Sequence, residues 1–329
     1  MTVGEAEGTM RAVVQHEYGS ADTWRVEKVA KPKASGKKVL VRVHAAGLDR
    51  GTWHLMTGKP YVMRPVTGFR GPRQPVPGRD LAGTVVEVGA EVTRFAPGDE
   101  VYGIAGGGTL AEYATPHQDK LDRKPANLSF EQAAVVPVSG LTALQAVDIG
   151  RVRTGQPVLV IGASGGVGSY LVQLAKIYGA DVTGVCGPSK VNLVKFLGAD
   201  RVLDYTTDDF ADGSDRYELI FDIGGNPSLE RLRRALTPTG TAVIVGGEDG
   251  GDWFGGMGRP MRARLLSPFT KQRLTNFVGR ERGLERLTGY LAAGTVKPCL
   301  DSSYPLDRAA EAMRRLEAGQ VRGKVAITV

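Results

Sequence analysis

A cluster of glycines between an apolar strand and a helix constrains this chain more than any other feature. The stretch VLVIGASGGVGSYLVQLAK covers residues 158–176. Glycines that follow a strand and open a helix typically bind the pyrophosphate of a dinucleotide, because the helix N-terminus offers unpaired N–H groups and a positive dipole. We therefore expect a dinucleotide at this turn, with a tight turn that binds no ligand as the alternative.

The positions of the turn have different expected roles. Gly165 lets the backbone approach the pyrophosphate, and Gly168 lets the helix pack closely against the sheet. Alanine stands where the fingerprint usually has its first glycine. The residues that we expect to contact the cofactor at the turn are Ala163, Ser164, Gly165, Gly166, Val167 and Gly168.

The pattern around the turn predicts a doubly wound α/β domain. The apolar runs VLVIG, DVTGVC, RVLDY, YELIFDIGG and TAVIVGG alternate with helices expected at 166–179, 189–198 and 228–236. Continuous apolar strands that alternate with helices form a parallel sheet covered on both faces. After residue 247 we expect an irregular stretch, then the strand RLTNFVG, helices near 283–294 and 307–319, and the final strand KVAITV.

The first part of the chain predicts β-structure. The short β-branched runs RAVVQHEYG, VLVRVHAAG, AGTVVEVG and GDEVYGIA each end in turn-forming residues. No strong helical period appears before Ser129, where Ser129 and Gln132 have the spacing of a capping box. We expect helical structure from there to the glycine-turn domain.

The residues after the second strand of that domain indicate which dinucleotide binds. NAD sites place an acidic residue there for the ribose 2′-hydroxyl, but this chain reads GVCGPSKVN. The hydroxyl of Ser189 and the cation of Lys190 suit a 2′-phosphate, and Tyr205 is placed to flank the adenine ribose. We therefore expect NADPH, unless Lys190 is an ordinary surface lysine.

Composition limits the compartment and the partners. The 329 residues contain two cysteines, no run of 18 apolar residues, and a polar N-terminal stretch unlike a signal peptide. We therefore expect a cytoplasmic protein without a membrane partner. Much of the net charge of +7 lies in the basic stretch 259–286, which we interpret as a solvated face rather than a nucleic-acid site.

Linked motifs resemble one known family. AAGLDRGTWH, PGRDLAGTVVEVG, FAPGDEVYG and GLTAL precede the glycine turn in this order, and together they resemble the medium-chain dehydrogenase/reductase superfamily, in particular its zinc-free quinone oxidoreductases. The resemblance implies a homodimer, with an active site in the cleft between two domains. It also implies a GroES-like domain at 10–130, a Rossmann domain at 131–265, and a sixth strand with a return to the first domain at 266–329. The polar residues 1–9 are expected to form a flexible tail.

Departures from the family pattern concern the metal. The positions that ligate catalytic zinc in alcohol dehydrogenases match Asp49, Arg79 and Val138, and neither arginine nor valine can bind zinc. We expect no metal, and an ion pair between Asp49 and Arg79 that orients an acceptor oxygen. Without a Lewis acid, a conjugated acceptor is easier to reduce than an isolated carbonyl. The resemblance thus favours NADPH-dependent reduction of quinones or α,β-unsaturated carbonyls.

The remaining site residues follow from the resemblance. His54 matches a proton-handling position, although Gly51 interrupts the relay that serves it in the dehydrogenases. Further expected cofactor contacts are Arg50, Thr142, Gly246, Gly247 and Lys324. The expected apolar walls of the substrate pocket are Trp53, Met56, Tyr61, Phe254 and Met257, for which plain core packing is the alternative. Two other functions stay open: a zinc-free carbonyl reductase, and a non-catalytic protein that binds NADPH or RNA.

Overall fold

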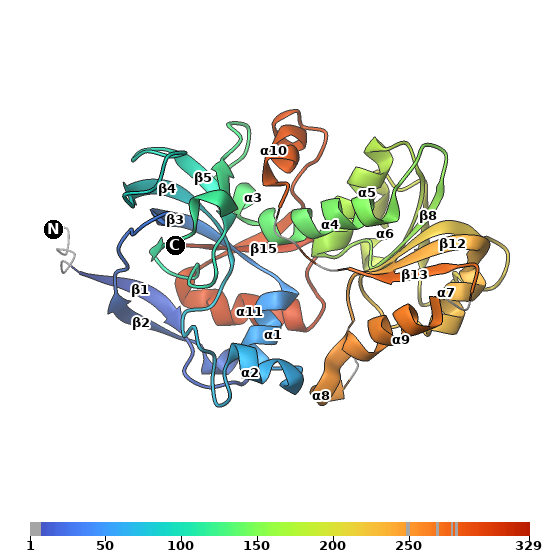
Figure 1. Ribbon diagram of the computed structural model, residues 1–329, viewed down its shortest axis with the longest axis horizontal. Helices are drawn as coiled ribbons and strands as arrows, with labels where there is room; N and C mark the ends of the chain where they lie inside the picture. Colours follow the sequence, from blue (N-terminus) through green and yellow to red (C-terminus); the bar gives the residue numbers. More distant parts are fainter. Residues whose placement is uncertain (1–7, 248–250, 268–269, 278, 280–281) are drawn as a thin grey trace.

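The computed structural model describes residues 8–247, 251–267, 270–277, 279 and 282–329. Within these residues the chain forms a six-stranded sheet, a seven-stranded sheet and a two-stranded sheet. We call the part built on the six-stranded sheet the parallel-sheet lobe, and the part built on the other two sheets the β-rich lobe. The two lobes lie at opposite ends of the longest axis of the molecule (Figure 1).

The parallel-sheet lobe contains the doubly wound parallel sheet that the sequence pattern predicts. Every pair of neighbouring strands is parallel, and the chain order across the sheet is 3-2-1-4-5-6, the order of a doubly wound dinucleotide-binding fold. From one edge to the other the strands are β10 (Arg201–Asp204), β9 (Asp181–Cys186), β8 (Pro157–Ile161), β11 (Tyr217–Asp222), β12 (Leu236–Ile244) and β13 (Arg273–Asn276).

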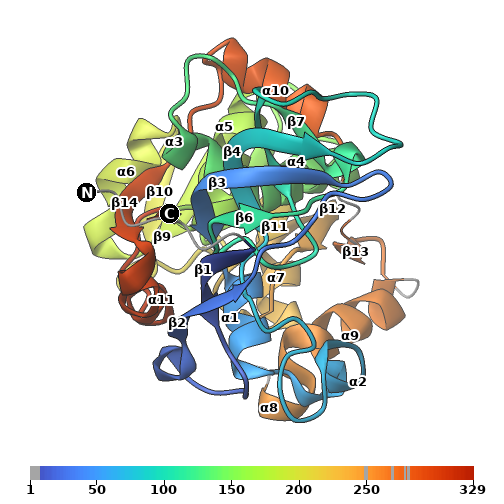
Figure 2. The ribbon, with the colours of Figure 1, turned by 90° about the vertical axis from the view of Figure 1, so that its left-hand side faces the viewer.

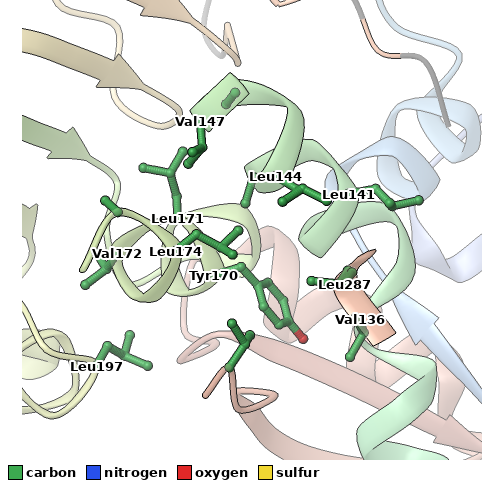
Figure 3. Close-up of a cluster of buried hydrophobic side chains, with 14 of the residues drawn as sticks. Val136, Leu141, Leu144, Val147, Tyr170, Leu171, Val172, Leu174, Leu197 and Leu287 are labelled. Atoms are coloured by element: carbon green, nitrogen blue, oxygen red, sulfur yellow. The ribbon is translucent and has the colours of Figure 1, made fainter. Parts of the chain in front are cut away.

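Both faces of this sheet are buried, because alternate residues of a strand point to opposite sides. Val158 and Val160 of β8 belong to one core cluster, and Leu159 and Ile161 belong to another. The first cluster, part of which Figure 3 shows, includes side chains of α4 (Pro137–Gly150), α5 (Gly166–Ile177), α6 (Val191–Phe196) and α10 (Leu284–Ala292). The second includes side chains of α7 (Leu229–Ala235) and α9 (Gly258–Leu266).

The β-rich lobe is completed by the end of the chain, as predicted. Its large sheet has the order β14 (Leu300–Pro305), β15 (Lys324–Thr328), β3 (Val39–Leu48), β4 (Asp80–Val88), β5 (Glu100–Ile104) and β7 (Leu121–Arg123), and β6 (Tyr113–Ala114) also pairs with β3. The small sheet pairs β1 (Thr9–Val14) with β2 (Arg25–Ala30). Buried side chains of α11 (Ala309–Glu317) join the same core.

The sequence predictions were wrong in omitting several short helices. The first part of the chain contains α1 (Arg50–Thr57) and α2 (Arg64–Thr67), and the stretch after residue 247 contains α8 (Gly251–Phe254) and α9. One or two helical turns are too short to show a period of 3.6 residues. The capping box at Ser129 is confirmed, but it opens only α3 (Phe130–Ala134), because Pro137 begins a separate helix. Strand β14 was not predicted either.

Candidate active site

The glycine turn between β8 and α5 has an open side and a closed side. Gly162 has a φ of +86°, which glycine adopts easily. A Cβ on Gly168 would lie 2.1 Å from the carbonyl oxygen of Gly162, so this position requires glycine for close packing. A Cβ on Gly165 would meet only that oxygen, at 3.4 Å. Gly165 caps α5 without any side-chain hydrogen bond, so the residues of the turn fit a pyrophosphate group.

The residues after β9 contact the end of the chain, which was not predicted. Lys190, in the short turn Pro188–Lys190 with Ser189, donates through Nζ to the carbonyl oxygens of Gly319 and Val321, both at 2.8 Å. Burial lowers the pKa of Lys190, and the nearby charge of Arg322 adds to this effect. The ammonium group therefore holds the segment before β15, although one of its three donors is left for a phosphate.

Two further side chains border this region. Tyr205 is exposed, and its hydroxyl lies 3.3 Å from where a Cβ on Gly187 would stand. Arg322, which is exposed, was missed by the sequence reasoning. Arg322 is far from Lys190 in the sequence. The parallel pairing of β15 with β14 brings the end of the chain close to Lys190. Tyr205, Lys190 and Arg322 are the polar groups available for an adenine ribose with a phosphate.

A buried ion pair lies beneath the glycine turn. Lys324 Nζ is 3.4 Å from Asp80 Oδ2, and both side chains are inaccessible to solvent. The backbone N–H of Val138 donates to Asp80 Oδ1 at 2.9 Å. A Cβ on Gly166 would lie 2.9 Å from Lys324 Cδ, so the lysine packs directly against the turn. Lys324 thus lies next to the glycine turn, as expected. Asp80 was missed, although it follows Arg79 in the quoted motif.

The environment of Asp80 shifts its protonation toward neutral pH. Burial raises the pKa of Asp80 to about 7, opposed by the charge of Lys324 and reinforced by that of Asp49. Asp80 therefore takes up a proton at a higher pH than an exposed aspartate does.

Asp49 has a structural role that was not predicted. It is the N-cap of α1, and its Oδ1 accepts from the N–H and the hydroxyl of Thr52 at 2.7 and 3.0 Å. Its Oδ2 is buried and has no hydrogen-bond partner. Next to this position Asp80 pairs with Lys324, and the pairing of Asp49 with Arg79 stays a prediction.

The zinc-ligand positions of the family hold one oxygen donor, one cation and one apolar side chain. Asp49 already caps a helix, and Val138 contributes its backbone N–H to Asp80. In the ranges that the structure describes, no three His, Cys, Asp or Glu side chains are grouped as metal ligands. The donor set of Asp49, Arg79 and Val138 does not fit a tetrahedral zinc ion.

His54 is half-buried on α1. Its Nδ1 lies 3.0 Å from the carbonyl oxygen of Lys59, and because a carbonyl only accepts, Nδ1 carries a proton and Nε2 is the atom that gains or loses one. The ring stacks edge-on against Trp53 at 4.9 Å, and the guanidinium of Arg50 lies 5.1 Å from the Trp53 ring.

Only some of the predicted apolar walls can contact a substrate. Met56 is buried in the core of the β-rich lobe, so its assignment to the pocket was wrong. Trp53 packs against the same core and donates to Glu317 at 3.1 Å. Tyr61 instead reaches the other lobe, where its ring meets Trp253 edge-on at 5.6 Å. Trp253 was missed. Phe254 is exposed, and the side chain of Met257 lies outside the described residues.

The other predicted cofactor contacts have partners within the chain. Thr142 donates to the carbonyl of Val138 at 2.7 Å. The carbonyl of Gly246 accepts from Arg259 at 3.1 Å, and a Cβ on Gly247 would clash with Gly256. These glycines therefore follow β12 in close contact with the segment that contains α8.

Two cations of the basic stretch 259–286 form internal ion pairs. Arg259 lies 2.5 Å from Asp222, which is fully buried, and burial raises the pKa of Asp222 to about 7 against the charge of Arg259. Arg286 forms two hydrogen bonds of 2.9 Å with Asp148. Part of the basic character is thus used within the fold. None of the helices in the described ranges has the length and apolar character needed to cross a bilayer.

Comparisons with known proteins agree with this architecture. The alcohol dehydrogenase GroES-like domain family matches residues 35–126, and the zinc-binding dehydrogenase family matches residues 197–327. The chain is 33% identical to the 2-methylene-furan-3-one reductase of Solanum lycopersicum, over 97% of this chain and 79% of that protein. It is 32% identical to the chloroplastic NADPH-dependent alkenal/one oxidoreductase of Arabidopsis thaliana, with the same coverage.

Solved structures share the whole fold. The quinone oxidoreductase of Coxiella burnetii superposes with a TM-score of 0.86 at 28% sequence identity, and the match covers 98% of this chain and 99% of that one.

Proposed function

The chain belongs to the quinone oxidoreductase-like branch of the medium-chain dehydrogenase/reductase superfamily and is an NAD(P)H-dependent oxidoreductase. On this premise we propose that it reduces quinones or the alkene bond of α,β-unsaturated carbonyls. We propose that it does so with NADPH and without zinc. The observation that carries the proposal is the donor set of Asp49, Arg79 and Val138 at the zinc positions. The names of the similar reductases, an alkenal/one oxidoreductase among them, support the same substrate class.

The cofactor preference rests on the end of β9. Ser189, Lys190 and Tyr205 offer hydroxyl groups and a cation, and no acidic residue lies in GPSK. Arg322 adds a second cation, whose charge lowers the pKa of Lys190. A 2′-phosphate is matched by this set, whereas the free 2′-hydroxyl of NADH gains little from it.

The residues around the turn would bind and orient the cofactor. The N–H groups at the start of α5 and the helix dipole stabilise the pyrophosphate, and Gly165 leaves room for it. When bound, the cofactor supplies a hydride to the substrate. Lys324 places its positive charge directly below this turn, balanced by Asp80.

The protein's own chemical step is the delivery of a proton. Hydride addition to an enone leaves an enolate, which must be protonated. The Nδ1–H of His54 donates a hydrogen bond to the carbonyl oxygen of Lys59, so Nε2 is the atom that would donate a proton to the enolate. A histidine gives up a proton near neutral pH, which suits this role.

We further propose that the enzyme is cytoplasmic and forms a homodimer through β13. This strand is at the edge of the parallel sheet, and an exposed edge favours pairing with a second copy. Both cysteines are free, in keeping with a reducing compartment.

The proposed activity is tested by following NADPH oxidation over quinones, enones, enals and saturated aldehydes. Elemental analysis of the same sample and treatment with a chelator test the metal-free mechanism. We expect turnover of conjugated acceptors, less than one zinc per chain, and no loss of activity to the chelator. One zinc per chain with chelator-sensitive reduction of saturated aldehydes would instead establish a carbonyl reductase.

A further inference from the structure

Six exposed apolar side chains gather where the two lobes meet beyond His54. We call them the apolar rim, and they are Val62, Met63, Val66, Phe69, Trp253 and Phe254. Val66, Phe69, Trp253 and Phe254 are 63–69% exposed. Scattered exposed apolar residues are normal on a protein surface, but a contiguous group of this kind marks a site of interaction.

Contacts between the lobes join the rim into one surface. Lys59 Nζ lies 2.9 Å from Asp252 Oδ1, and the Tyr61 ring meets Trp253. A Cβ on Gly255 would lie 3.1 Å from Pro60. Figures 1 and 2, which are turned by 90°, both place α2 and α8 together at the same end of the molecule. The rim therefore combines exposed side chains of both lobes that lie on neighbouring elements.

The charge beside the rim is basic along residues 58–79 and acidic next to Trp253, where Asp252 lies. Residues 58–79 contain Lys59, Arg64, Arg70, Arg73 and Arg79 but no aspartate or glutamate. Asp252 of α8 neutralises Lys59. Arg70 and Arg73 are exposed next to Phe69, so aromatic and aliphatic side chains are flanked by positive charge.

We propose that the apolar rim is a docking surface for an anionic lipid bilayer. Apolar side chains that enter the headgroup region, with tryptophan at the interface and cations beside anionic lipids, are the features by which proteins bind membrane surfaces. This peripheral contact needs no membrane-spanning segment, and it departs from the expectation of a protein without a membrane partner. Lys59, whose carbonyl binds His54, connects the rim to the candidate active site, so an apolar substrate would enter directly from the bilayer.

The test uses the full-length protein without substrate, so it does not depend on the proposed reaction. Vesicles of phosphatidylcholine with phosphatidylglycerol are compared with vesicles of phosphatidylcholine alone, by co-sedimentation and tryptophan fluorescence. The chain has three tryptophans; Trp24 is buried and Trp53 half-buried, so a blue shift reports on Trp253. We expect binding at least roughly tenfold tighter to the anionic vesicles, together with that shift.

Matched variants separate the rim from general basic charge. Val66→Ser with Phe69→Ser, and Arg70→Glu with Arg73→Glu, should each weaken vesicle binding by roughly tenfold or more. The control Phe196→Ser removes an 80% exposed side chain on α6, and Lys195→Glu reverses an exposed charge there; both should bind vesicles like the wild type. NADPH affinity checks that all variants are folded.

Three outcomes would overturn the proposal. The first is absence of binding by the wild type to anionic vesicles, and the second is equal weakening by the α6 variants. The third is a change of molecular mass in solution caused by the rim variants, which would make this surface an interface between copies of the chain.

Discussion

Lys190 connects cofactor choice to the position of the chain end. Its Nζ holds two carbonyl groups of the segment before β15, at Gly319 and Val321, and Arg322 lies close enough to affect its pKa. A cofactor phosphate at this place would meet both cations, so the end of the chain and the cofactor share one binding residue.

Replacing Lys190 tests this connection. We expect Lys190→Ala to reduce the preference for NADPH over NADH by roughly ten- to a hundredfold, since one charged hydrogen bond contributes about 1.5–3 kcal/mol. The measurement is the dissociation constant of each cofactor, with Lys195→Ala on the same segment as the control. Equal affinities of the wild type for both cofactors would show that Ser189 and Lys190 do not recognise the phosphate.

The proposed role of His54 as the proton donor is tested by a substitution that removes its titrating ring. His54→Gln keeps a hydrogen-bonding side chain but removes the titrating group, so we expect single-turnover reduction of an enone to slow by up to about 10²-fold, with a changed pH profile. The loss is expected to be modest because solvent can also protonate an enolate. If rate and pH profile stay as in the wild type, water is the acid and His54 only lines the site.

At the scale of elements, two glycines of one turn provide a matched pair. Gly168→Ala places a Cβ 2.1 Å from the oxygen of Gly162, so we expect a lower melting temperature, with about 1–3 kcal/mol lost to overpacking. In Gly165→Ala the Cβ makes only an ordinary contact, 3.4 Å from that oxygen, so the melting temperature should change little while cofactor affinity falls. Thermal unfolding and cofactor titration of both variants check this. Loss of affinity without loss of stability in Gly168→Ala would contradict the close-packing role.

The elements could be predicted where their signal is long. Alternating strands and helices, with strands such as VLVIG buried on both faces, predict a parallel sheet, because parallel strands need crossover connections. Helices α1, α2 and α8 could not be predicted, since each is at most eight residues long. Asp49 is the N-cap of α1, which is a start signal for a helix. Its match to a zinc-ligand position favoured a different role in the sequence.

The site was predictable where neighbours in sequence form it and much less where the fold brings distant residues together. The glycine turn is a single segment, and its geometry agrees with the roles given to Gly165 and Gly168. The pair of Asp80 with Lys324 joins residues 244 positions apart, and Tyr61 meets Trp253 across the two lobes. No local pattern records such contacts.

At the scale of the whole molecule, two buried carboxyl groups make stability depend on pH. Asp80 and Asp222 have pKa values raised from 3.8 to about 7, so the folded state binds more protons than the unfolded state between these values. The contribution of each carboxyl group to the free energy of unfolding is complete below about pH 4. It is lost as the pH rises to about 7, by about 1.4 kcal/mol per pH unit.

Chemical unfolding between pH 5 and 7 measures this effect. We expect Asp80→Asn and Asp222→Asn each to remove part of the decline in unfolding free energy, although each variant also leaves a cation without its carboxylate. The exposed control Glu230→Gln on α7 should keep the full slope. An unchanged slope in both Asn variants would mean that these carboxyl groups are already charged at pH 5.

The central claim is that this enzyme adds hydride to carbon of a conjugated acceptor and not to the carbonyl itself. The most direct measurement uses NADPH deuterated at the transferable position, a cyclic enone and the metal-free protein, with the product analysed by NMR. The account predicts a saturated ketone that carries deuterium on the β-carbon. Deuterium on the carbinol carbon of an allylic alcohol would contradict it and assign the protein to carbonyl reduction.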